Sequence, residues 1–194
     1  MRQITPTVKH LLIINCILFV GTYLLGNKDF FYGLLALYYP LSDYFMPWQV
    51  FSHMFMHGGF RHLFFNMFAL FMFGTAVERV FGQRKFLFLY ISSGLGAVAL
   101  TFLVYYVKIY PILSELETLG FSSDFIKEVI KSNFLSDNLF QGEELKPVLL
   151  NYGYSMKLNA DSFQMLFDLI DSSNGSMVGA SGAIMGILVA FGML

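Results

Sequence analysis

The sequence predicts an all-α membrane protein with several transmembrane helices, and two observations support this prediction. Hydrophobic residues make up 56% of the 194 positions and charged residues only 13%, whereas a soluble domain has roughly 45–50% and about 25%. The charges are also concentrated, because ten of the 13 acidic residues lie between Lys108 and Ser176. Apolar blocks therefore flank one polar insert, and the few remaining charges could hardly cover a water-facing surface.

The composition also excludes several classes of function. The net charge of -1 gives no electrostatic reason to expect nucleic-acid binding. The single cysteine, Cys16, excludes an intramolecular disulfide framework and a multi-cysteine metal site. No phosphate loop, nucleotide fingerprint or calcium loop occurs, so we expect no cofactor and no metal. The oligomeric state is not determined by the sequence.

Four apolar blocks are candidate spans, at residues 10–26, about 62–77, 86–107 and 176–194. A helix needs about 20 apolar residues to cross a bilayer. The third block has this length, and the first has it if its ends tilt or snorkel. The second is short unless it begins near Gly59 or continues through Glu78. The fourth is followed by neither a basic flank nor a polar loop, so we interpret it as a helix cut in mid-span.

Basic residues in short loops predict the orientation in the membrane. Two precede the first block and three follow the second: Arg2, Lys9, Arg79, Arg84 and Lys85. No small-residue cleavage site follows the first block, which favours an uncleaved signal anchor. We expect an integral, multi-pass protein of a plasma (inner) membrane. Its N-terminus and residues 79–85 would be cytoplasmic, and residues 27–61 and 108–176 would lie outside.

The segment 29–60 is too aromatic for a plain loop, and Pro40 and Pro47 prevent it from being a fifth span. Tyr and Trp favour the headgroup level of a bilayer. We therefore expect short amphipathic helices lying partly in the outer leaflet. The alternative is an extracellular loop packed on its own core.

The polar insert contains two apolar stripes at helical spacing. They comprise Phe163, Leu166, Phe167 and Ile170, and Ile126, Val129, Ile130 and Phe134. We expect these stripes to pack against each other rather than to bind a ligand.

His62 and Asn66 open the second apolar block and lie four residues apart, so they share one helical face. Ionisable and polar groups inside a membrane indicate function by default. Both side chains can present N–H donors at the outer end of the span. Hydrogen bonding between helices is an equally open explanation.

Ser181 follows Gly179 at the start of the fourth block. Gly182 and Gly186 form a small-xxx-small face that lets another backbone come close. The unpaired N–H groups of a helix start would surround the serine oxygen, which is the arrangement an oxyanion needs. The motif is not the G-x-S-x-G turn of soluble hydrolases, because Ala183 occupies its last position.

His53 and His57 have the i, i+4 spacing of zinc ligands on a helix, and His62 follows closely. However, no glutamate follows His53 in the metalloprotease pattern, and no carboxylate lies nearby. We favour structural or water-holding histidines.

Together these residues resemble the rhomboid intramembrane serine proteases, whose signatures occur here in the family's order. They are Trp48-Gln49 with His53, His57, His62 and Asn66; Gly74-Thr75-Ala76-Val77-Glu78-Arg79 with Gly82; and Gly179-Ala180-Ser181-Gly182 with Gly186. The resemblance implies a rhomboid-like six-helix bundle. The chain would be incomplete, with four core helices and the fourth cut short. Its parts would be core helices 1–3 with the outer loop (1–107), a polar helical insert (108–175) and the start of helix 4 (176–194).

The resemblance also implies the chemistry. Ser181 would be the nucleophile of a Ser–His dyad without an acid. His62, Asn66 and the Ser181 N–H would donate to the oxyanion, and Gly179, Gly182 and Gly186 would serve the motif and its packing. Substrates would be transmembrane segments of other proteins, cleaved in the lipid bilayer.

The sequence departs from the family pattern in three ways. The family's Trp-Arg pair reads Trp48-Gln49, which we expect to loosen the contacts of the first outer loop, and the insert is unusually long. None of the four histidines, the fourth being His10, lies in the Ala-His-x-x-Gly context of the family's general base. We therefore expect the base to lie beyond this chain and the 194 residues alone to be inactive. The alternative is a non-catalytic rhomboid-like protein that binds client transmembrane helices.

Overall fold

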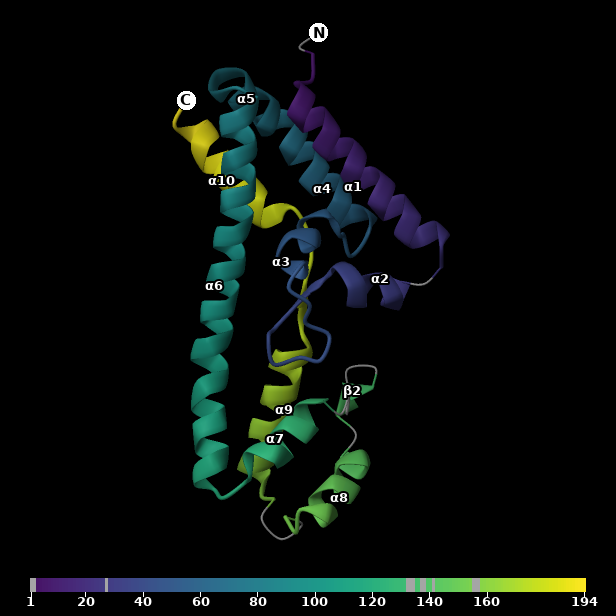
Figure 1. The fold of residues 1–194 in the computed structure, drawn as a ribbon, viewed down its shortest axis with the longest axis vertical. Helices are drawn as coiled ribbons and strands as arrows, with labels where there is room; N and C mark the ends of the chain where they lie inside the picture. The colour runs from purple at the N-terminus through teal and green to yellow at the C-terminus, as the bar shows by residue number, and fades with distance from the viewer. Residues whose placement is uncertain (1–2, 27, 132–134, 137–138, 141, 155–157) are drawn as a thin grey trace. The chain divides into compact units, whose positions relative to one another are not determined.

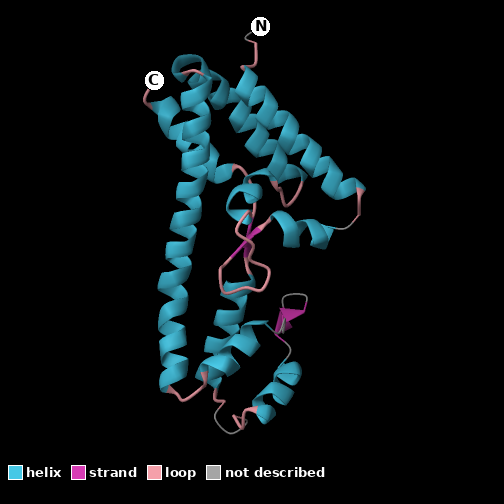
Figure 2. Cartoon of the chain, in the orientation of Figure 1, coloured by secondary structure: helices cyan, strands magenta, loops and turns pink. Residues whose placement is uncertain are grey.

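The computed structural model describes residues 3–26, 28–131, 135–136, 139–140, 142–154 and 158–194. Helices predominate in these residues (Figure 2). Each strand has two residues. The all-α prediction is therefore confirmed. The chain divides into two compact units, one formed by residues 1–37, 46–101 and 176–194 and the other by residues 38–45 and 102–175.

Three stretches among the described residues are long and apolar enough to cross a membrane: Pro6–Leu24, Phe60–Phe81 and Gln83–Thr118. The first is helix α1 and the third is helix α6. The second is continuous over 22 residues and consists of α4 (Phe60–Ala69), a π-helical turn η2 (Leu70–Gly74) and α5 (Thr75–Phe81). The second span thus begins before His62 and runs past Glu78, which resolves its apparent shortness.

Two other apolar blocks differ from their predicted limits. Helix α6 continues past Val107 to Thr118, because Ile109 and Leu116 are buried in the core of the second unit. The fourth block opens with strand β4 (Ser176–Met177), and helix α10 covers only Ser181–Gly192. Strand β4 pairs with β1 (Leu37–Tyr38).

The π-helical turn lies at the centre of the first unit, where it contacts α1, α4, α5 and α10. Figure 1 shows α1 running alongside α4. Val8, Leu70 and Ile187 are completely buried in the core that these elements share, as is Tyr90 of α6. This packing fixes the second span between its neighbours, so residues at both of its ends are held by the fold.

Glu78 caps the start of α1 from the far end of the second span. Its two carboxylate oxygens accept hydrogen bonds from the backbone N–H groups of Thr7 (3.0 Å) and Val8 (2.9 Å). The helix's own N-cap residue, Thr5, makes no side-chain capping bond. A carboxylate is stabilised at a helix N-terminus because the first-turn N–H groups carry partial positive charge. Glu78 is therefore buried but has partners.

The segment before the second span is stabilised by hydrogen bonds between its own residues. It contains α2 (Lys28–Leu35), α3 (Gln49–Ser52) and a 3-10 turn η1 (His53–Phe55), so the predicted short helices are present. Three side chains donate to the last carbonyl groups of α2, which have no partner within their own helix. They are Trp48 Nε1 to Leu34 O (2.8 Å), Gln49 Nε2 to Gly33 O (2.8 Å) and Ser52 Oγ to Leu35 O (2.9 Å).

The expected loosening at Gln49 is not observed. The Gln49 side chain is fully buried, and its oxygen also accepts from the Met46 N–H at 3.1 Å. A glutamine amide has both a donor and an acceptor, so it joins the end of α2 to the turn before α3. The depth of this segment in a bilayer stays a prediction.

The second unit includes α7 (Ser123–Lys131), α8 (Gly142–Asn151), α9 (Ala160–Asn174) and the antiparallel pair β2 (Leu135–Ser136) and β3 (Leu139–Phe140). The two apolar stripes do pack together, as predicted. Helices α7 and α9 are in contact, and Ile126, Val129, Ile130, Leu166 and Ile170 are buried in one core. Phe134 lies outside the described residues.

Candidate active site

The turn before α10 lies directly against the first two turns of the second span. A Cβ atom at Gly179 would lie 2.6 Å from His62 Cε1 and Nε2 and 3.3 Å from Asn66 Nδ2. The Gly179 backbone has a φ of +113°, which side chains other than glycine rarely adopt. Its N–H donates to the His53 carbonyl at 2.8 Å. Only glycine fits here, and it brings residues 53, 62, 66 and 179 together.

Ser181 is the first residue of α10, two positions after this contact. Its side chain is exposed, and Ala180 is the N-cap of the helix. Helix geometry leaves the first-turn N–H groups, including that of Ser181, without acceptors inside the helix. These groups also form the positive end of the helix dipole. The serine hydroxyl is thus accessible and lies where negative charge is stabilised.

Asn66 holds a donor with no acceptor. The residue is 7% exposed, and within the described part of the chain its Nδ2 is buried and has no hydrogen-bond partner. Leaving such a group unsatisfied costs about 1–3 kcal/mol. An interhelical bond through this nitrogen, the alternative considered for Asn66, does not occur among the described residues. A buried donor beside Gly179 is therefore left without an acceptor among the described residues.

Two further histidines lie beside this site. The rings of His57 and His62 are 5.1 Å apart, and both nitrogens of His57 are buried without a partner among the described residues. Burial lowers the pKa of His57 to about 4, and the nearby His62 acts in the same direction. Burial also lowers the pKa of His53, whose Nδ1 lies 2.8 Å from the Gln49 carbonyl. Since a carbonyl only accepts, this Nδ1 carries the proton.

The described residues contain no group of three His, Cys, Asp or Glu side chains that could hold a metal ion. His53 and His57, at their i, i+4 spacing, belong to no such group among these residues. His53 instead links α3 to the Gly179 turn, through its ring on one side and its carbonyl on the other.

Close packing against α6 positions α10. A Cβ atom at Gly182 would lie 2.5 Å from Ala97 Cβ, and one at Gly186 would overlap the Ser93 side chain. The backbone of α10 can therefore approach α6 only because these two positions are glycine. This contact restricts how far the Ser181 turn can move relative to the rest of the first unit.

Sequence reasoning did not single out Tyr32 on α2. A Cβ atom at Gly58 would lie 2.9 Å from the Tyr32 hydroxyl and 3.9 Å from Val178 Cγ2. Tyr32 therefore borders the turn that carries His57 and the segment that leads to Gly179. No periodicity or motif connects residues 32, 58 and 178, so only the folded chain identifies this contact.

These features describe a helical integral membrane protein with an exposed serine two residues after the contact of Gly179 with His62 and Asn66. Residues 44–123 match the family model of the Rhomboid domain. This match ends before Ser181, and it includes only the beginning of the insert.

Curated relatives agree with this match. The putative rhomboid protease YdcA of Bacillus subtilis (strain 168) is 40% identical over 48 residues, covering 25% of this chain and 24% of the relative. The rhomboid protease GluP of the same organism is 42% identical over 53 residues, covering 27% and 10%. The rhomboid protease AarA of Providencia stuartii is 44% identical over 50 residues, covering 26% and 18%. The matches thus cover between a tenth and a quarter of these relatives. Together the family-model match and these relatives support a rhomboid family member.

Proposed function

We propose that this chain carries the nucleophile and oxyanion site of an intramembrane serine protease that cleaves transmembrane segments of other proteins. The contact of Gly179 with His62 and Asn66 is the observation that supports this proposal most directly. It brings the turn that leads into Ser181 against two side chains that can donate hydrogen bonds. A purely binding protein would leave the unsatisfied Asn66 amide without a role.

In the proposed reaction, Ser181 Oγ attacks the carbonyl carbon of the scissile peptide bond and forms a tetrahedral intermediate. The carbonyl oxygen becomes an oxyanion and accepts hydrogen bonds from Asn66 Nδ2, the His62 ring and the Ser181 N–H. A general base takes the proton of Ser181, the C–N bond breaks, and the amine leaves with that proton; water then hydrolyses the acyl-enzyme. Preorganised donors stabilise the transition state because they are already oriented where the charge develops.

The serine also needs a general base, since its hydroxyl is a poor nucleophile near neutral pH. His62 has the oxyanion role, His53 Nδ1 is bound to the Gln49 carbonyl and His10 is an exposed residue of α1. Although His57 lies beside the site, its low pKa makes it a weak proton acceptor. In this proposal the base is a histidine outside the 194 residues, and these residues alone are inactive.

The remaining predictions on topology and substrates belong to the same proposal. The N-terminus would lie in the cytoplasm, and the insert 108–175 would lie on the side where substrates are cleaved. The site would then open near the outer face of a plasma (inner) membrane. Transmembrane protein substrates would reach it through the bilayer.

A serine-directed fluorophosphonate probe tests the nucleophile in the full-length protein. We expect the probe to label the protein, Ser181→Ala to abolish labelling and Ser92→Ala to retain it. Ser92 is a suitable control because it is also an exposed serine of a membrane helix. Labelling that persists after loss of the Ser181 hydroxyl would refute the assignment. A protein that never reacts would favour the non-catalytic role of binding client helices.

A further inference from the structure

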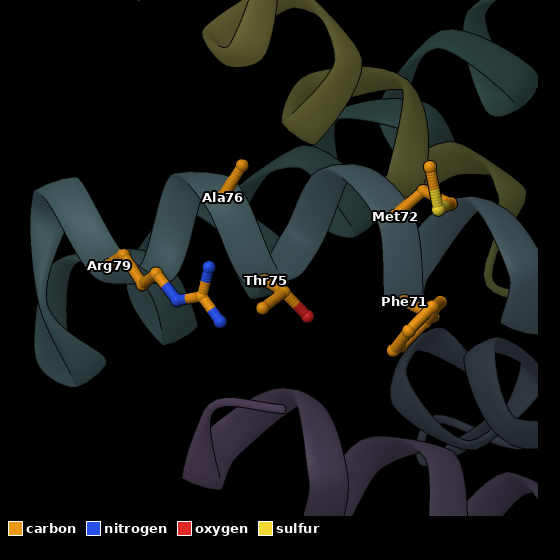
Figure 3. A pocket seen from close by; sticks show the side chains of 5 residues that line it. All are labelled: Phe71, Met72, Thr75, Ala76 and Arg79. Carbon is orange, nitrogen blue, oxygen red and sulfur yellow. The ribbon is translucent and has the colours of Figure 1, made fainter. Parts of the chain in front are cut away.

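A small pocket at the other end of the second span has no part in the proposed chemistry. It has a volume of about 140 Å³ and is lined by Phe71, Met72, Thr75, Ala76 and Arg79 (Figure 3). From Asn66 to Arg79 a helix rises by roughly 20 Å, so this pocket is remote from the Ser181 site. Phe71, Thr75 and Arg79 follow one another at intervals of four residues. One face of the span therefore carries, in order along its length, an aromatic ring, a hydroxyl group and a guanidinium group.

The Thr75 hydroxyl is the unsatisfied polar group of this pocket. Thr75 is 7% exposed, and within the described ranges its Oγ1 is buried and lacks a hydrogen-bond partner. A threonine inside a helix ordinarily bonds the carbonyl four residues earlier. Here the preceding residues form the π-helical turn η2 (Leu70–Gly74), a feature that occurs frequently at functional sites. The hydroxyl is thus buried in a pocket wall and can bond to a ligand.

Arg79 supplies uncompensated positive charge. Its guanidinium extends back along the helix toward Thr75 (Figure 3). One of its nitrogens donates to the Gln3 carbonyl, and a guanidinium has five N–H donors in all. The carboxylate of the neighbouring Glu78 is bound to the backbone N–H groups of Thr7 and Val8. None of the ion pairs found in the described residues involves Arg79, and the exposed bases Arg84 and Lys85 follow it.

The apolar part of the face indicates which anion fits. Phe71 and Met72 are 37% and 49% exposed in a stretch that is long and apolar enough to cross a membrane. A cavity of about 150 Å³ with apolar walls accommodates a molecule as large as benzene. A pocket of this size can hold several methylene groups beside a polar headgroup. An anion with an attached hydrocarbon chain therefore matches the pocket better than a free anion.

We propose that this pocket binds the headgroup of an anionic phospholipid from the adjacent leaflet. The phosphate accepts hydrogen bonds from the Arg79 guanidinium and the Thr75 hydroxyl, and the start of one acyl chain covers Phe71 and Met72. Arginine suits this role because its planar fork binds two phosphate oxygens at once. Basic pockets at the ends of membrane helices are a recognised location for such headgroups.

Lipid titration with native mass spectrometry tests the site on the detergent-solubilised full-length protein. We expect dioleoylphosphatidylglycerol to bind at least tenfold more tightly than dioleoylphosphatidylcholine. Arg79→Gln should weaken binding of the anionic lipid by about tenfold, as expected for a lost hydrogen bond to a charged group. Arg84→Gln is the matched control, because Arg84 lies near the same end but outside the pocket, and it should change the affinity less than twofold.

Thr75→Val keeps the shape of the side chain and leaves Arg79 and its bond to Gln3 in place. We expect this variant to weaken binding about fivefold with unchanged helix content in far-ultraviolet circular dichroism. An unchanged affinity in Thr75→Val, or equal losses in Arg79→Gln and Arg84→Gln, would overturn the proposal in favour of diffuse attraction. Displacement of the lipid by an equal concentration of inorganic phosphate would also overturn it, since the apolar face would then contribute nothing.

Discussion

Replacement of Gly179 by alanine is the most direct physical test of the site. The new Cβ would lie 2.6 Å from two atoms of the His62 ring, and the backbone φ is +113°. Holding a residue other than glycine in such a conformation costs about 1–3 kcal/mol. Overpacking a well-filled site costs about 1–3 kcal/mol more. We therefore expect Gly179→Ala to lower the free energy of unfolding by about 2–6 kcal/mol, unless the Ser181 turn moves away from His62.

Either response of the turn is measurable. Denaturant titration in detergent, followed by circular dichroism, reports the free energy of unfolding. Fluorophosphonate labelling of the full-length protein reports the position of Ser181. Gly96→Ala is the matched control, because a Cβ there meets no atom within 4 Å, and alanine is the better helix former. If Gly179→Ala is as stable and as reactive as the wild type, the contact between this turn and His62 has been wrongly inferred.

Three further predictions concern neighbouring groups. Asn66→Ala should slow cleavage by the full-length protein about 10²–10³-fold, the usual effect of losing one oxyanion donor, and an unchanged rate would limit Asn66 to a structural role. Glu78→Gln should lower the free energy of unfolding by about 1–3 kcal/mol, because it weakens the capping of α1; the exposed Glu117→Gln should leave it unchanged. Acid should destabilise the fold through His57, because the pKa of this histidine falls from 6.5 to about 4 on folding. The free energy of unfolding should therefore be unaffected by His57 above pH 6.5 and should decrease as the pH falls toward 4, by up to about 3 kcal/mol. His57→Phe should remove this part of the pH dependence measured by denaturant titration, whereas substitution of the exposed His10 should not.

The sequence predicted the helical elements well but not their limits. Apolar composition is a local property, so the blocks around α1, α4 and α6 could be identified directly. The extension of α6 to Thr118 depends on the burial of Ile109 and Leu116 by residues distant in the chain. Likewise, the cap on α1 comes from Glu78, about 70 residues later. Neither effect has a signature within a short window of sequence.

The candidate site shows the same division. The motifs indicated Ser181, His62 and Asn66 as candidates by residue type and order, but they did not predict the contact of Gly179 with the second span. The contact of Tyr32 with the turn at Gly58 was not predicted, because a tyrosine on a short helix belongs to no sequence motif. The expectation for Gln49 was wrong for a chemical reason: its amide makes contacts through both ends of the group. Although glutamine has fewer hydrogen-bond donors than arginine, Gln49 still holds the segment before the second span in place.

The π-helical turn also determines how the two ends of the second span are rotated relative to each other. Each residue of an α-helix turns the chain by about 100°, and a π-turn accommodates one additional residue within the helix. If residues 70–74 formed an ordinary α-helix instead, this additional residue would rotate Glu78 and Arg79 by about a quarter of a revolution around the helix axis relative to His62 and Asn66. The carboxylate would then miss the amino end of α1. The rotation of one end of this span relative to the other therefore determines whether Glu78 can reach α1 while His62 and Asn66 contact Gly179.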